Sequence, residues 1–126
     1  MKKNTLTKSR FVHGLDCQKL LWYEYNQPEA LPQLDATTEK RIDMGQQIGE
    51  LARTLFPGGI LVPEERSLQV HADASIKLAL AGKKVLFEPG FLCDGFYARA
   101  DILVPAPGNS WDIVEVKSTT EINDKA

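Results

Sequence analysis

Apolar residues recur at helical spacing in three stretches of the first 82 residues, and each stretch is followed by residues that stop a helix. The stop signals are Asn26-Gln27-Pro28, Pro57-Gly58-Gly59 and Gly82. Thr7 can cap the first helix, and Thr37 or Thr38 can cap the second. The pattern therefore predicts helices over about residues 7–25, 37–55 and 70–80.

From Lys84 onward the pattern changes to short apolar runs separated by turn residues, which is typical of strands. Cys93-Asp94-Gly95 indicates a tight turn, and residues 105–110 indicate a loop between two strands. The expected strands are residues 60–62, 85–88, 91–92, 96–104 and 112–117. Helices followed by a mainly antiparallel β-meander predict an α+β fold, and without a repeat or linker residues 1–126 form a single domain.

The composition excludes only a few classes of function. The 126 residues carry a formal net charge of -2, so any binding of nucleic acid would depend on a local basic surface. Two cysteines without CxxC spacing argue against a disulfide scaffold and fit a reducing cytoplasm. A membrane span needs roughly 20 apolar residues in a row, and the sequence has no such run, so we expect no membrane partner.

The loop at residues 105–110 allows the register of the last hairpin to be predicted. If its centre lies between Pro107 and Gly108, paired residue numbers sum to 215 or 216, which places Asp101 opposite Val114 or Glu115. Residues directly opposed in such a pair have Cβ atoms about 5 Å apart, close enough for two carboxylates to share a cation. Lys117 follows Glu115 by two positions and projects from the same face.

Two adjacent acids flanked by apolar residues repel each other unless a cation lies between them, and oxygen ligands favour Mg²⁺ or Mn²⁺. A bound divalent ion and a nearby lysine suit the hydrolysis of phosphodiester bonds. The same residues also fit a solvated surface ion pair, and spacing alone favours that alternative.

A longer string of residues favours the metal site. Arg99-Ala100-Asp101-Ile102-Leu103, followed by Trp111-Asp112-Ile113-Val114-Glu115-Val116-Lys117-Ser118, resembles the RecB-like branch of the PD-(D/E)XK nucleases, whose signature is an Asp on one strand and Glu-x-Lys on the next. Upstream, residues 6–11 and 14–22 are similar to the N-terminal segment of members related to the CRISPR spacer-acquisition nucleases and the AddB helicase-nuclease subunit.

This resemblance implies a restriction-endonuclease-like core and a DNA substrate, and it assigns roles to single residues. Asp101, Glu115 and the Val116 carbonyl would bind the metal, and Lys117 would be the catalytic lysine. The acid or histidine that the family carries on a helix falls at Glu50, where the nearest relatives have histidine; a solvated helix residue is an equal alternative. Glu88, on a neighbouring strand, ranks third among the acids.

The resemblance also bears on the cysteines and on the extent of the chain. Cys17 matches the first cysteine of the iron–sulfur members, whose other three ligands lie beyond the nuclease core. Two cysteines cannot hold a [4Fe–4S] cluster, so we expect Cys17 to be a buried free thiol here and a cluster ligand only in a longer parent protein. The family's glutamine-bearing helix after the Glu-x-Lys strand is missing, so we expect a truncated domain.

Three hypotheses follow: a metal-dependent nuclease, a catalytically inactive nucleic-acid-binding or assembly module of the same fold, and a purely structural domain. A truncated core would expose apolar surface and favour a homo-oligomer. His13 and His71 lack metal-ligand spacing and are expected to be ordinary polar residues. The N-terminal cations could contact phosphates or form a solvated basic face: Lys2, Lys3, Lys8, Arg10 and Lys19.

Overall fold

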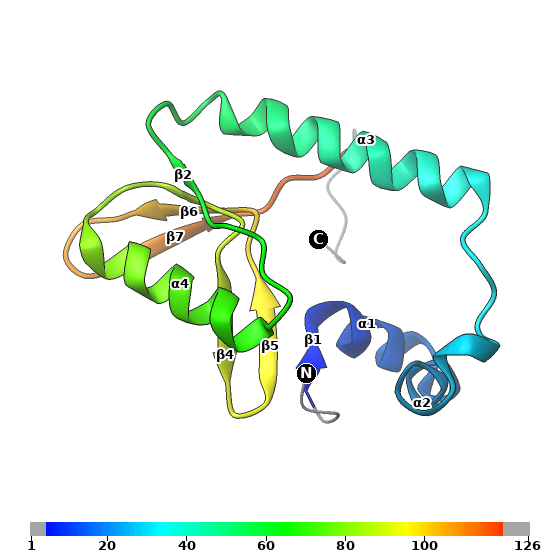
Figure 1. The fold of residues 1–126 in the computed structure, drawn as a ribbon. Helices are drawn as coiled ribbons and strands as arrows, with labels where there is room; N and C mark the ends of the chain where they lie inside the picture. Colours follow the sequence, from blue (N-terminus) through cyan, green and yellow to red (C-terminus); the bar gives the residue numbers. More distant parts are fainter. Residues whose placement is uncertain (1–4, 120–126) are drawn as a thin grey trace.

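The computed structural model describes residues 5–119 as four α-helices and two small β-sheets (Figure 1). The helices are α1 (Lys8–Asp16), α2 (Gln18–Asn26), α3 (Ala36–Arg53) and α4 (Leu68–Ala81), with one turn of 3-10 helix at Pro28–Ala30. The strands are β1 (Leu6–Thr7), β2 (Ile60–Leu61), β3 (Leu86–Phe87), β4 (Gly90–Cys93), β5 (Phe96–Arg99), β6 (Ile102–Pro105) and β7 (Trp111–Val114). The α+β class is confirmed.

The strands do not form the single antiparallel meander that the sequence predicts. One sheet has the order β1-β5-β4 and the other β2-β3-β6-β7. Both sheets are mixed, because β1 runs parallel to β5 and β2 runs parallel to β3, whereas the remaining pairs are antiparallel. The β1–β5 pair brings an N-terminal segment next to a strand about 90 residues later, and the β2–β3 pair joins the segments on either side of α4.

The expected strand over residues 96–104 is wrong, because β5 and β6 belong to different sheets. At Ala100 and Asp101 the chain passes from β5 in the three-stranded sheet to β6 in the four-stranded sheet. At Glu88 and Pro89 it makes the opposite passage, from β3 to β4. Pro89 has no N–H to give to a ladder, but its carbonyl accepts the Ala100 N–H at 3.0 Å. The alternation of apolar residues at Ala98, Ala100 and Ile102 continues past this corner, so the sequence pattern alone does not reveal it.

A small core lies between α4 and the four-stranded sheet. Leu86, Val62 and Leu103 are 0–5% exposed and form its centre, and partly buried residues from α4 pack against them. The predicted helix over residues 70–80 is confirmed and begins slightly earlier, because the Ser67 hydroxyl accepts the Val70 N–H. This packed half of the molecule holds the strands on which the candidate site depends.

The predicted helix over residues 7–25 is two helices. Thr7 caps α1 as expected, but the backbone becomes extended at Cys17 and α2 folds back against α1. A Cβ on Gly14 would lie 2.8 Å from Leu21 Cδ2, so the two helices approach closely at that glycine. Apolar spacing continues from one helix into the next because both helices present apolar residues toward their shared side.

The helix α3 is the longest, and Asp35 rather than Thr37 or Thr38 caps it by accepting the Thr38 N–H at 2.7 Å. None of the residues in α1, α2 or α3 is buried, whereas α4 buries His71, Ala72 and Ser75. Across the described residues, no helix combines the length and apolar character that a membrane crossing requires.

Candidate metal centre

Three acidic residues lie in a row across the four-stranded sheet, one on each of three adjacent strand ends. In the hairpin β6–β7, Ile102 pairs with Val114, so the next position brings Asp101 beside Glu115. On the other side, Phe87 pairs with Ile102, and the Glu88 N–H donates to the Asp101 carbonyl at 2.9 Å. The acid row is therefore Glu88, Asp101 and Glu115. The predicted hairpin register, with a sum of 216, is confirmed.

Asp101 is the central member of the acid row and is partly buried. Its Oδ2 accepts the Val116 N–H at 2.7 Å. The predicted strand over residues 112–117 is too long, because β7 ends at Val114. Residues 115–117 are irregular, and the Asp101 side chain, rather than a sheet partner, binds this segment at Val116.

Glu115 forms one end of the acid row and is held by two lysines. Lys117 Nζ lies 2.9 Å and Lys8 Nζ 3.0 Å from the same oxygen, Glu115 Oε1. Partial burial alone would raise the pKa of Glu115, but hydrogen bonds from Lys117 and Lys8 outweigh it and lower that pKa below its usual value. The hydrogen bond to Glu115 in turn raises the pKa of Lys117. Glu115 and Lys117 share one side, as the sequence predicts.

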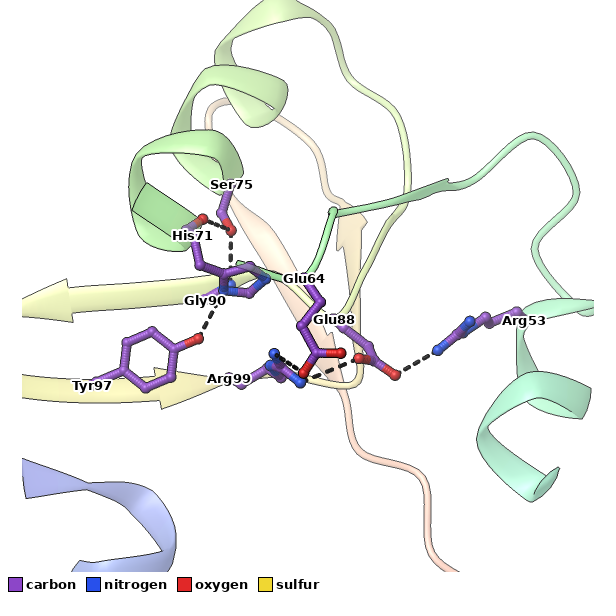
Figure 2. A network of polar contacts seen from close by, with 8 residues as sticks. All are labelled: Arg53, Glu64, His71, Ser75, Glu88, Gly90, Tyr97 and Arg99. Carbon is purple, nitrogen blue, oxygen red and sulfur yellow. Dashed lines mark hydrogen bonds and ion pairs between the residues drawn. The ribbon is translucent and has the colours of Figure 1, made fainter. Parts of the chain in front are cut away.

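Glu88 forms the other end of the acid row and is held by two arginines (Figure 2). Arg53 Nη2 lies 2.5 Å from Glu88 Oε1, and Arg99 Nη1 lies 3.4 Å from Glu88 Oε2. Arg99 also reaches the exposed Glu64 at 3.6 Å. Glu88 has a φ of 55°, in the left-handed region, which is uncommon for a non-glycine residue and often accompanies functional sites.

An open cleft of about 660 Å³ lies between α3 and the acid row. One face of α3 lines it, at the helical spacing of Ile42, Gly45, Gly49 and Arg53. Four residues that the sequence assigns to the metal site also line it: Glu50, Glu88, Asp101 and Val116. Glu115 and Lys117 stand on either side of Val116 in the sequence and are not part of the lining. Glu50 is thus an exposed helix residue that faces the same cleft as Asp101.

The residues of the acid row fit a hard divalent cation by donor chemistry. Asp101 and Glu115 supply carboxylate oxygens, and Mg²⁺ is commonly held by one or two carboxylates while keeping several waters. The described residues do not gather three acid, histidine or cysteine side chains into one metal-binding group. A cation at Asp101 and Glu115 would therefore retain much of its water shell and would compete with two lysines for Glu115.

His71 is a fully buried residue behind the cleft, which corrects the expectation of an ordinary polar histidine. It is 1% exposed, and its Nδ1 lies 2.7 Å from the Tyr97 hydroxyl (Figure 2). Its Nε2 is buried and has no hydrogen-bond partner among the described residues. Burial first, and then the positive charge of Arg99, lower the pKa of His71 below its ordinary value. His13, in contrast, is exposed and pairs with Glu24 at 2.6 Å.

The cysteines do not form a cluster site within this chain. Cys17 lies exposed at the junction of α1 and α2, and Cys93 lies exposed on β4. The expected burial of Cys17 is therefore wrong, because this residue ends one helix and begins the next instead of facing a core. Two thiols cannot supply the four ligands of a [4Fe–4S] cluster.

Sequence reasoning missed the cations that hold the acid row. Lys8 belongs to the N-terminal group of basic residues, but only the folded chain brings it to Glu115, 107 positions away. Arg99 stands two residues before Asp101 in the sequence, and this proximity was the signal that could have identified it as part of the site. Of the other N-terminal cations, Arg10 stacks on Tyr25 and Lys19 lies near Tyr23, whereas Lys2 and Lys3 fall outside the described residues.

Comparisons with protein-family models, with curated proteins and with solved structures give no match to this chain. The resemblance to RecB-like nucleases therefore stays a prediction that rests on the residues themselves.

Proposed function

We propose that this chain is a Mg²⁺- or Mn²⁺-dependent nuclease domain that hydrolyses phosphodiester bonds in DNA. The observation that carries the proposal is the register of β6 and β7, which sets Asp101 beside Glu115 at the end of the sheet with Lys117 on the Glu115 carboxylate. The cleft gives a substrate access to Asp101 and Val116, two members of the proposed site. The motif order Asp, then Glu-x-Lys, adds independent support from the sequence.

Each residue of the site has a distinct task in this proposal. Asp101, Glu115 and the Val116 carbonyl hold the metal, which when bound polarises a phosphoryl oxygen and lowers the pKa of a bound water. The Val116 N–H orients the Asp101 carboxylate by donating to Oδ2. Lys117 carries a positive charge at neutral pH and can neutralise charge that develops on the phosphate. Glu50 and Glu88 border the cleft as further oxygen donors.

A second candidate is a catalytically inactive DNA-binding or assembly module of the same fold. Two observations favour it: Glu115 already has two cationic partners, and the described residues form no three-donor metal group. In that case Lys8 and Lys117 would neutralise Glu115 permanently, and the acid row would be a structural ion-pair network. DNA binding that needs no metal, without cleavage, would support this candidate.

Titration with Mn²⁺ tests the metal site directly. The wild-type chain should bind Mn²⁺, and Asp101→Ala should weaken binding by at least about ten-fold, because it removes the central carboxylate. Asp101→Asn keeps an oxygen for the Val116 N–H and removes only the charge, so it separates metal loss from misfolding. Asp112→Ala is the control, because Asp112 is an exposed acid on the same hairpin. Equal binding by wild type and both Asp101 variants would disprove the site.

Cleavage of DNA tests the catalytic role of Lys117. The wild-type chain should cut single- or double-stranded DNA when Mg²⁺ or Mn²⁺ is present, and Lys117→Ala should abolish cutting while Mn²⁺ still binds at Asp101. Undiminished cutting by Lys117→Ala would refute the mechanism but leave the metal site intact.

A further inference from the structure

The two ends of the acid row share an arrangement that the nuclease motif does not explain. Each outer acid holds two cations, one from the sheet region and one from a helix outside the sheet. Glu115 holds Lys117 and, from the first residue of α1, Lys8. Glu88 holds Arg99 and, from the last residue of α3, Arg53.

The Glu115 end of the acid row has more positive than negative charge, whereas at the Glu88 end two arginines meet two glutamates. At the Glu115 end, two ammonium groups meet one carboxylate oxygen, and like charges brought this close repel each other. At the Glu88 end, two guanidinium groups share one carboxylate, and the additional acid, Glu64, is 86% exposed and only 3.6 Å from Arg99. Exposed pairs of this kind are weak, so Glu64 holds Arg99 only loosely.

The cations at both ends of the acid row are accessible from solvent. The side chains of Lys8 and Lys117 are 55% and 45% exposed, and Arg99 is 38% exposed. Arg53 is less exposed, at 25%, but lines the cleft with Arg99. Strands in a sheet lie about 4.8 Å apart, so the outer acids of the row lie roughly 10 Å apart with Asp101 between them.

We propose that Lys8 and Arg53 bind backbone phosphates of a nucleic-acid strand on either side of the acid row. This inference rests on the proposed function, because Asp101 between them would hold the metal at the reacting phosphate. A phosphate oxygen replaces the shared carboxylate as the partner of each helix-borne cation, while Lys117 and Arg99 stay with Glu115 and Glu88. The strand thus crosses β3, β6 and β7 in the direction of the row.

The salt dependence of DNA binding tests this assignment. Affinity for a fluorescent oligo-dT single strand is measured by anisotropy at several NaCl concentrations, with Ca²⁺ in place of Mg²⁺. Each phosphate contact that is lost lowers the slope of log affinity against log salt by about 0.7 for single strands. Lys8→Ala and Arg53→Ala should each lower the slope by that amount, and the double variant by about twice as much. Lys8→Arg and Arg53→Lys should largely keep the wild-type slope.

Two controls separate phosphate binding from general effects of charge or folding. Lys40→Ala on α3 and Lys77→Ala on α4 remove exposed lysines that do not line the cleft, and they should leave the slope unchanged. Glu88→Gln removes the negative partner of Arg53 and Arg99, so it should raise the affinity for DNA. If the ion pairs of Glu88 were purely structural, Glu88→Gln would loosen the site and lower the affinity for DNA.

The outcomes separate this inference from the proposed function. Unchanged slopes in Lys8→Ala and Arg53→Ala, a change in only one of them, or no binding of DNA by wild type would overturn the two-ended assignment. The Mn²⁺ titration of Asp101 variants still reports on the metal site in each of those cases. Lowered slopes together with Mn²⁺ binding that ignores Asp101 would instead support the phosphate contacts and reject the nuclease.

Discussion

The half of the molecule around α4 and the half formed by α1, α2 and α3 are held in place by different forces. Around α4, the side chains of Leu86, Val62 and Leu103 are almost completely buried, and their removal from water stabilises the fold. The other three helices bury no residue and expose large apolar side chains. The exposed side chains include Phe11, Leu15, Trp22, Ile42, Met44 and Leu51.

Polar contacts attach the outer helices to the sheet. Lys8 joins α1 to Glu115, and Arg53 joins α3 to Glu88. The Tyr25 hydroxyl also donates to the Thr5 carbonyl at 2.6 Å, beside β1. Ion pairs at partly exposed positions stabilise a fold by little, about 1 kcal/mol or less. The candidate site therefore lies where the sheet meets helices that contribute few buried side chains.

The largest expected effect comes from truncating the packed half. Leu86→Ala should lower the free energy of unfolding by about 2–5 kcal/mol, because it leaves a cavity at the centre of the core. Leu51→Ala on α3 removes a side chain that is 68% exposed and should change that free energy by less than about 0.5 kcal/mol. Urea denaturation followed by circular dichroism measures both. Similar losses in the two variants would show that α3 packs as tightly as α4.

The sequence predicted the packed half better than the outer helices, for a physical reason. Local signals, such as Gly82 after α4 and the loop at residues 105–110, mark the ends of elements that the core then holds. At Cys17 the helical spacing continues although the backbone becomes extended and ends α1, and Gly14 then allows Leu21 of α2 to approach α1 closely. Parallel pairing of β1 with β5 joins segments about 90 residues apart, and local patterns carry no information on it.

The next largest expected effect is a dependence of folding stability on pH, which should originate in the packed half. The pKa of His71 is lowered in the folded chain, whereas the unfolded chain takes up the proton near the ordinary value of 6.5. The unfolded state therefore binds more protons just below pH 6.5, so stability falls as the pH drops from about 6.5 toward the lowered pKa. The contribution of Glu115 to stability is lost only below about pH 4.5, because its pKa in the folded chain is lowered from that value.

Histidine variants identify the source of this pH dependence. His71→Gln should remove most of the fall in stability between pH 6.5 and 5, measured by urea denaturation at each pH. His13→Gln is the matched control, because His13 is exposed on α1 and pairs with Glu24. If the pH dependence persists in His71→Gln but vanishes in His13→Gln, the outer helices rather than the core carry the titrating group.

For the candidate site, the sequence predicted positions along the strands but not the partners from the helices. The position of the loop limited the register of β6 and β7 to two alternatives, with Asp101 opposite Val114 or Glu115, and the structure has the second. The link from Lys8 to Glu115 depends on how α1 docks, and Arg53 reaches Glu88 only because α3 ends beside β2. Neither docking leaves a local pattern in the sequence, which is why both cations were missed.

The smallest expected effect comes from a methyl group added to α3. A Cβ on Gly45 meets no heavy atom within 4 Å, so Gly45→Ala adds no clash and raises helix propensity by about 0.8–1 kcal/mol. If α3 opens independently of the core, its amide hydrogens should exchange about four- to five-fold more slowly, whereas exchange in β3 and β6 stays unchanged. Gly49→Ala, one turn further along, should behave the same way. Equal slowing in the strands would mean that α3 unfolds together with the core, and the two halves would then be one cooperative unit.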